Sequence, residues 1–466
     1  MIKRTLMLSS IAILAAIGAG TAAAEPWEKG YVVGFYKPAF HYGGRADFAQ
    51  PGLIEPGVDC PTGSTTHFAN PAMAKKSLSL VRWRSAEEVH ALANPPVTDT
   101  AERTGAGLYY PIWRAASAYR GYTPDMNTYI NPFAAEDPGQ PQVVGRIGEG
   151  FNLDGKIKES DFVSPNGLKG IDNQLYRAWG CDAPWRGIGQ GLLVLRSNDK
   201  MTEGLFTVVI RISGNQDPMN DNDATLEIGY SPDKIMKNAV GEVGADYSYR
   251  ILSTSEQYTK LKATVKDGVI ETEQADIHMP QIAWFYNQNR DVFFRDGKVR
   301  VVPKPDGSAD GLVGGYRDWR DLYAQNVFAQ DGGQQGVREH EDHVALYYAL
   351  RRHADGMLNP QTGRYDGVSS AYRMDLVPAF VVDADKPIDH SVPDNERRRW
   401  DAFSDTAAAM IKATETLVVQ DVPPGSGENA VGRGGVPLQR RRGPANQTVD
   451  EPADGEPVSP RTRSGR

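Results

Sequence analysis

The sequence contains only two cysteines in 466 residues, and several motifs that carry chemistry are missing from it altogether. No CxxCH motif is present, so covalent attachment of a c-type haem is excluded. A four-cysteine zinc site and a Cys/His zinc knuckle are excluded as well. The chain also lacks a Gly-x-Ser-x-Gly elbow, a Walker loop and a Gly-x-Gly-x-x-Gly fingerprint, so nothing supports a serine hydrolase or a bound nucleotide.

A surplus of positive charge is missing too. The chain has 51 Lys and Arg against 59 Asp and Glu, a net charge of −8. We therefore expect no nucleic-acid partner, because binding to phosphates needs a basic face. With 40% hydrophobic and 24% charged residues the composition is that of a soluble globular protein, and 48 Gly and 31 Pro favour loops and strands over a helical bundle.

The first residues have the features of an export signal. Lys3 and Arg4 precede a short apolar stretch at residues 6–18, and Ala22-Ala23-Ala24 supplies small residues for cleavage before Glu25. The apolar stretch is short for a membrane span, although an uncleaved anchor is the alternative. We expect a periplasmic or secreted protein with no stable membrane span after signal cleavage, and a partner that is an extracellular or cell-envelope ligand.

Cys60 and Cys181 are the two cysteines. In an exported chain a pair of cysteines predicts one disulfide bond, which here would connect the N-terminal region to the centre of the chain. The alternative is two unpaired thiols, because spacing alone does not establish pairing.

The predicted fold is mainly β with helical additions. A signal peptide at 1–24 precedes a loop-rich, aromatic N-terminal lobe at 25–145. An antiparallel β-sandwich, lectin-like or jelly-roll-like, is expected at 146–316. A helical C-terminal region at 317–421 follows, and the Pro-, Gly- and Arg-rich end at 422–466 is predicted to be a disordered tail.

The strand prediction depends on short runs of β-branched and aromatic residues. They lie at 192–196, 205–213, 225–230, 259–266, 269–277, 291–295 and 298–302. The run at 259–266 alternates, with Leu261, Ala263 and Val265 on the face expected to be buried. Asp267-Gly268 and Asp296-Gly297 each predict a hairpin turn, because this pair tolerates the positive φ of a type I′ turn.

Helical spacing begins after residue 316. Trp319, Leu322 and Tyr323 recur on one helix face, and a second helix is predicted from about Arg338 to His353. Residues 369–382 are expected to return as a strand, and a third helix is predicted from Asp394 or Asn395 onward.

The segment at residues 150–161 resembles the calcium loop of an EF-hand. Asn152 and Asp154 fall on two oxygen-donating positions, Gly155 on the sharp turn and Asp161 on the closing carboxylate. The resemblance covers this loop alone, and Gly150 replaces the first acid. It implies calcium as a candidate cofactor; the alternative is a plain Asp-Gly turn.

A second acidic loop lies between two predicted strands. It offers the carboxylates of Asp217, Asp221 and Asp223 at close range, which suits a weak calcium site outside the cytosol. The alternative is that Asn, Asp and Pro serve here only as turn formers.

Two further sets of residues are candidates for catalysis. His340 and His343 would lie on one side of a helix, close enough to share a metal, although the spacing is one residue shorter than in His-Glu-x-x-His. Glu271 and Glu273 would project from one face of a strand. Their placement is loosely similar to the acid and nucleophile of sandwich glycoside hydrolases, without the Glu-x-Asp-x-x-Glu order of that family. The alternatives are a solvated helix turn and a solvated sheet face.

The sequence thus predicts an exported protein whose β-sandwich binds an extracellular ligand, with a glycan or another polymer as the candidate and calcium in a structural role. Trp284, Phe285 and Tyr286 are the candidate ligand-binding residues, because aromatic rings stack on sugars. The alternative function is a carboxylate- or metal-assisted extracellular hydrolase that uses the acids and histidines named above.

Overall fold

The computed structural model describes the chain in several stretches. These are residues 26–41, 57–65, 132–182, 198–199, 201–203, 206–238, 241–280, 291–328 and 342–383, together with single positions between 70 and 87 and at 186. The predicted signal peptide at 1–24 and the predicted tail at 422–466 lie outside the described residues.

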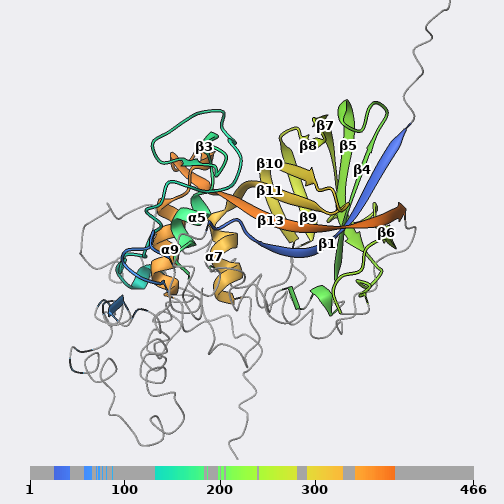
Figure 1. The fold of residues 1–466 in the computed structure, drawn as a ribbon. Helices are drawn as coiled ribbons and strands as arrows, with labels where there is room; N and C mark the ends of the chain where they lie inside the picture. Colours follow the sequence, from blue (N-terminus) through green and yellow to red (C-terminus); the bar gives the residue numbers. More distant parts are fainter. Residues whose placement is uncertain are drawn as a thin grey trace, which may run out of the picture. The chain divides into compact units, whose positions relative to one another are not determined.

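Within these stretches, eight antiparallel strands close into a barrel (Figure 1). The barrel strands are β1 (Trp27–Pro38), β4 (Thr207–Gly214), β5 (Asn220–Ser231), β7 (Thr259–Lys266), β8 (Val269–Thr272), β10 (Asp291–Pro303), β11 (Ala309–Asp318) and β13 (Arg364–Asp383). Each strand pairs with the next, and β13 pairs back onto β1, with Tyr31 opposite Pro378. Closure removes the free edges that an open sheet would have.

The closed barrel confirms the mainly β class but does not support the predicted sandwich. A sandwich needs two separate sheets, whereas here the β1–β13 pairing joins both ends into one sheet. The barrel takes β1 from the region predicted as a loop-rich lobe and β13 from the region predicted as helical. The predicted strand at residues 369–382 is the greater part of β13.

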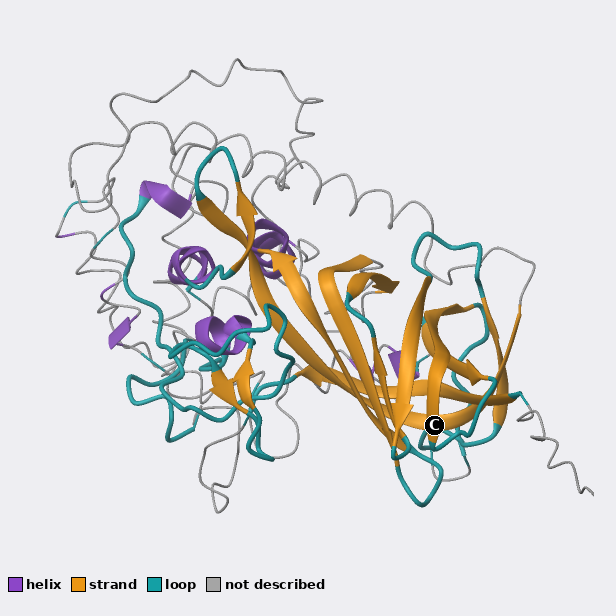
Figure 2. Cartoon of the chain, turned by 90° about the horizontal axis from the view of Figure 1, so that it is seen from above, coloured by secondary structure: helices purple, strands orange, loops and turns teal. Residues whose placement is uncertain are grey.

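The remaining elements are shorter and attach to the barrel or lie beside it. They are β6 (Tyr247–Ile251) beside β13, β9 (Ala275–Pro280) beside β10, β12 (Gly356–Asn359) beside β13, the pair β2 (Phe162–Val163) and β3 (Lys169–Ile171), the 3-10 helix η3 (Pro132–Ala134), and the helices α5 (Gln174–Trp179), α7 (Trp319–Phe328) and α9 (His343–Arg352). The three α-helices lie together in both views (Figure 1 and Figure 2).

Apolar side chains of the barrel strands form one buried cluster. In β7 the alternation predicted from the sequence is confirmed, because Leu261, Ala263 and Val265 are all buried. Their cross-strand neighbours belong to the same buried cluster, which runs through the barrel strands. An eight-stranded barrel has an interior just wide enough for side chains to fill. The barrel is therefore a scaffold, and chemistry is expected at its rim.

The two Asp-Gly pairs have different outcomes. Asp267 and Gly268, with φ of 51° and 79°, turn the chain between β7 and β8, so this hairpin is confirmed. The second predicted hairpin is wrong, because Asp296-Gly297 lies inside the continuous strand β10. There the positive φ of Asp296, 48°, accompanies a register shift against β11 between Arg295 and Lys298. A left-handed residue can make a bulge as well as a turn.

Both described helices of the C-terminal region use the predicted apolar positions. Trp319, Leu322 and Tyr323 are buried in α7. The second helix, α9, begins at His343 rather than near Arg338, because the Asp342 side chain accepts a hydrogen bond from the Ala345 amide at 2.9 Å and caps the helix there. The third predicted helix lies outside the described residues.

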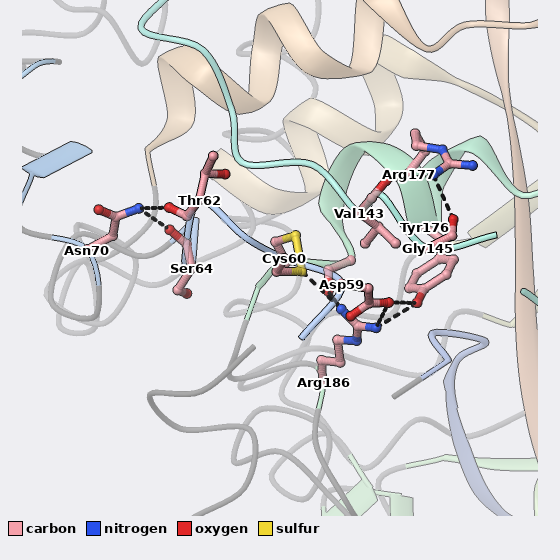
Figure 3. The surroundings of a disulfide bond; sticks show 12 residues. Asp59, Cys60, Thr62, Ser64, Asn70, Val143, Gly145, Tyr176, Arg177 and Arg186 are labelled. Atoms are coloured by element: carbon pink, nitrogen blue, oxygen red, sulfur yellow. Dashed lines mark hydrogen bonds and ion pairs between the residues drawn. A yellow bond between two sulfur atoms is a disulfide. The ribbon is translucent and has the colours of Figure 1, made fainter. Parts of the chain in front are cut away.

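The predicted disulfide between Cys60 and Cys181 is confirmed, with 5.7 Å between the Cα atoms. It joins the 57–65 segment to the residues that follow α5. Figure 3 shows the buried Arg186 guanidinium beside the bridge, close to Asp59 and Tyr176. Arg186 donates hydrogen bonds to the Cys60 sulfur at 3.0 Å, to Asp59 at 2.5 Å and to the Tyr176 hydroxyl at 2.6 Å. This buried cation is therefore neutralised and serves to hold the segments together.

Removing the disulfide is expected to destabilise the fold strongly. The bridge closes a loop with a sequence separation of 121 residues. In the chain-entropy account a loop of this size contributes about 3–5 kcal/mol. Urea unfolding of the mature chain should show a loss of this size in the Cys60→Ser/Cys181→Ser variant. Dithiothreitol should lower the midpoint of the wild type and leave the variant unchanged. A wild-type midpoint unchanged after full reduction, verified by thiol titration, would contradict this role.

Candidate functional site

In the loop that resembles an EF-hand, the carboxylates of Asp154 and Asp161 are bonded to other residues of the same loop. Asp154 accepts a hydrogen bond from the Lys156 amide at 2.9 Å and forms an ion pair with Lys158 at 2.5 Å. Asp161 accepts a hydrogen bond from the Lys158 amide at 2.5 Å. The Lys158 ammonium thus supplies to Asp154 the positive charge that a calcium ion would bring.

Asn152 completes the predicted ligand set, and its side chain is only partly satisfied. The amide group donates to the Lys156 carbonyl at 2.9 Å, while the buried Oδ1 has no partner. Among the residues that the structure describes, no group of three or more His, Cys, Asp or Glu side chains could hold a metal ion. Calcium at Asn152, Asp154 and Asp161 therefore stays a prediction.

The acidic loop between β4 and β5 is organised as a turn. The fully buried Asp221 accepts hydrogen bonds from the Trp27 indole at 3.0 Å and from the amides of residues 215 and 216 at 3.0 and 2.9 Å. Burial favours the neutral acid, but these hydrogen bonds outweigh it and lower the pKa of Asp221. Asp217 accepts a bond from a turn amide, and the Asp223 amide donates to Asp221. Each contact fits the turn-forming alternative.

Glu271 and Glu273 lie in different surroundings. Glu271 makes ion pairs with Lys298 and Arg300, both at 2.7 Å. Burial opposes its charge, but these contacts lower the pKa of Glu271, so it is poorly suited to donate a proton at neutral pH. Glu273 is exposed at the break between β8 and β9.

The other predicted site residues are either buried or not described. His343 is the first residue of α9 and is 3% exposed. His340 lies outside the described residues, as do Trp284, Phe285 and Tyr286 in the connection between β9 and β10. Their roles stay predictions.

A site that the sequence did not single out lies where β3, β12 and β13 approach one another. Asp172 follows β3, and Asp355 precedes β12. Ser369 of β13 connects them, because it donates to Asp355 through its amide and its hydroxyl, both at 2.7 Å, and accepts from the Gln174 amide at 2.9 Å. We call Asp172 and Asp355 the acid pair.

Asp172 is the more deeply buried member of the acid pair. Asp172 is 1% exposed, and its Oδ2 accepts a hydrogen bond from the Leu153 amide at 2.7 Å. The other oxygen, Oδ1, is buried and has no hydrogen-bond partner among the described residues. Asp355 is only half-buried. The acid pair thus combines a fully buried residue that has one unsatisfied oxygen with a residue that is only half-buried.

Both carboxyl groups of the acid pair resist ionisation. Burial, followed by the charges of Asp154 and Asp161, raises the pKa of Asp172 to about 6 despite the Leu153 amide. Burial, followed by the charge of Asp172, raises the pKa of Asp355 to about 7 despite the two bonds from Ser369. Groups with such values exchange protons near neutral pH. Chemically, the acid pair can accept hydrogen bonds from a ligand or transfer a proton.

Tyr316 of β11 borders the acid pair. It is 5% exposed and packs with Phe151 and Leu153 in a small apolar cluster. Burial and the charges of Asp172 and Asp355 raise the pKa of its hydroxyl, which stays a hydrogen-bond donor. Gly356 makes this packing feasible, because a Cβ at that position would come within 2.3 Å of the Tyr316 ring.

The acid pair had little signal in the sequence. Its two members are far apart along the chain, so no spacing pattern joins them. Asp355-Gly356 has the composition of a turn. The one usable signal was Asp172-Asn173-Gln174, three polar residues directly after the apolar Ile171, which the structure buries together.

Comparison of the chain with protein-family profiles, with curated proteins and with solved structures gives no match. Among the described residues, no helix is both long and apolar enough to cross a membrane.

Replacing Asp172 is expected to stabilise the protein at high pH. Its folded pKa of about 6 lies above the ordinary 3.8, so the folded chain binds this proton more tightly than the unfolded chain. The resulting penalty is absent below about pH 4, grows as the pH rises, and is complete above about pH 6. After allowance for solvent screening, Asp172→Asn should gain about 1–2 kcal/mol at pH 8 and almost nothing at pH 4.

Urea unfolding at both pH values measures this gain. Glu273→Gln, which removes an exposed carboxylate, is the matched control and should not show the pH-dependent gain. An Asp172→Asn variant that is less stable than the wild type at pH 8 would show that the charge of Asp172 is compensated in the fold.

Proposed function

We propose that the protein is an exported binding protein that holds a hydroxyl-rich extracellular ligand, such as a glycan, at the acid pair. The observation that carries this proposal is the buried Oδ1 of Asp172, which has no hydrogen-bond donor. Leaving a buried acceptor without a donor costs about 1–3 kcal/mol, and more for a charged group. A ligand hydroxyl can supply the missing donor.

The fold supports a site at the barrel rim rather than inside the barrel. Apolar side chains of the barrel strands form a buried cluster, whereas Asp355 is only half-buried. The disulfide between Cys60 and Cys181 is consistent with a periplasmic or secreted location, because such bonds persist in oxidising compartments. Trp284, Phe285 and Tyr286 remain candidates for stacking on the same ligand.

The raised pKa values favour a second candidate, a carboxylate-assisted extracellular hydrolase. In that case the acid pair replaces Glu271 and Glu273 as the catalytic carboxylates. Asp355, with a pKa of about 7, has the value expected of a general acid near neutral pH. Ion-paired Glu271 lacks this property.

Binding to a panel of soluble oligosaccharides tests the proposal. Asp172→Asn and Asp355→Asn should each weaken the binding of the oligosaccharide held by the wild type by about tenfold or more, because a hydrogen bond to a charged acceptor is lost. Glu273→Gln should bind as the wild type does. Unchanged binding by both acid-pair variants would contradict a site at the acid pair.

Incubation of the same oligosaccharides with the wild type separates the two candidates. The binding protein returns them intact. Release of new reducing ends by the wild type, lost in Asp355→Asn while binding persists, would establish the hydrolase instead.

A further inference from the structure

The charges around the acid pair indicate a further property of the ligand, in addition to its hydroxyl groups. The charges of Asp154 and Asp161 act on Asp172, and the charge of Asp172 acts on Asp355. Lys158 is a cation of the loop, and its ammonium is engaged by Asp154 at 2.5 Å. Arg300, which lies 5.0 Å from the Phe151 ring, is engaged by Glu271. Among the described residues, neither member of the acid pair has an ion-pair partner.

The unsatisfied atoms at this point are acceptors. Oδ1 of Asp172 and Oδ1 of Asn152 are both buried and without a partner in the described part of the chain, and Asp172 is only 1% exposed. A group that satisfied either atom would therefore have to donate a hydrogen bond. Because the acid pair is negatively charged when ionised, it attracts a positively charged donor more strongly than a neutral one.

We propose that the ligand group held at the acid pair is a primary ammonium, so that the ligand is an amino sugar polymer with free amines. This inference rests on the proposed function and narrows its ligand class. An ammonium group has three donors and one positive charge, which matches the unsatisfied acceptor of Asp172 and a carboxylate pair that has no ion-pair partner among the described residues. The apolar cluster of Phe151, Leu153 and Tyr316 lowers the local dielectric constant and strengthens the attraction.

A metal ion fits this point less well than an ammonium. No group of three His, Cys, Asp or Glu side chains within the described residues could hold one. The loop already accommodates an ammonium, because Lys158 lies against Asp154. A ligand ammonium is therefore compatible with the neighbouring acceptors.

Binding should depend on pH in a definite direction. An ammonium ligand binds the ionised acid pair, so affinity should rise between about pH 5 and pH 8, as Asp172 and Asp355 lose their protons. The affinity should fall again when the ligand amine itself loses its proton. The titratable and charged groups that act on the acid pair or on Tyr316 beside it are Asp154, Lys158, Asp161 and Asp296.

Two oligomers that differ only in acetylation test the inference. Isothermal titration of the mature chain should give at least tenfold tighter binding for a glucosamine oligomer than for the N-acetylglucosamine oligomer of the same length. Asp172→Asn and Asp355→Asn should abolish this preference. Glu273→Gln removes one negative charge elsewhere and should keep it, which separates recognition by the acid pair from general attraction to an acidic protein.

The remaining outcomes also decide between the possibilities. Equal affinity for the two oligomers would overturn ammonium recognition and leave the proposed glycan-binding function standing. A preference that survives in both acid-pair variants would overturn the assignment to this site. Tight binding of a polyamine such as spermidine without binding of either oligomer would uphold ammonium recognition and overturn the glycan ligand. Binding of none of these probes would overturn both proposals.

Discussion

The pairing of β1 with β13 is the contact on which the rest of the structure depends. It joins residues 31–38 of β1 to residues 372–378 of β13, and it turns a meander of strands into a closed barrel. Gly30 permits the close approach, because a Cβ there would lie 2.4 Å from the Ala379 carbonyl oxygen. Without this pairing β1 and β13 would be open edges, ready to pair with another chain.

The pairing of β11 with β13 helps to determine where the acid pair is built. β13 places Ser369 opposite Tyr316 of β11, and Ser369 in turn binds Asp355 and the Gln174 amide beside Asp172. One serine on a barrel strand thus binds Asp355 and the segment that contains Asp172. A rigid strand is a better support for such a site than a loop. The barrel contributes rigidity, and the segments at its rim contribute the chemistry.

The acid pair is kept at an energetic cost. Each carboxyl group is buried enough for its pKa to rise by two units or more above the ordinary 3.8, and one oxygen has no donor. Asp221, by contrast, accepts four hydrogen bonds on its two oxygens. Local rules of folding are broken at the acid pair and obeyed at Asp221, a contrast that is typical of a functional site beside a structural one.

Features that depend on nearby residues could be predicted from the sequence. The alternation of Leu261, Ala263 and Val265 predicted β7, and Asp267-Gly268 predicted its hairpin. The disulfide could be predicted because the chain contains only two cysteines. Features that depend on distant residues could not be predicted. Asp296-Gly297 has the same local signal as the true turn, and only pairing with β9 and β11 makes it a bulge. The acid pair likewise brings together residues that are far apart in the sequence.

Direct titration of the acid pair is the most decisive measurement. Carbon-13 NMR of the side-chain carboxyl groups follows each aspartate separately, and the signals are assigned by their loss in Asp172→Asn and Asp355→Asn. The structure predicts titration of Asp172 near pH 6 and of Asp355 near pH 7, with burial as the main cause of both upward shifts and the charge of Asp172 adding to that of Asp355. Midpoints near the ordinary value of about 4 for both groups would contradict a desolvated acid pair and the function argued from it.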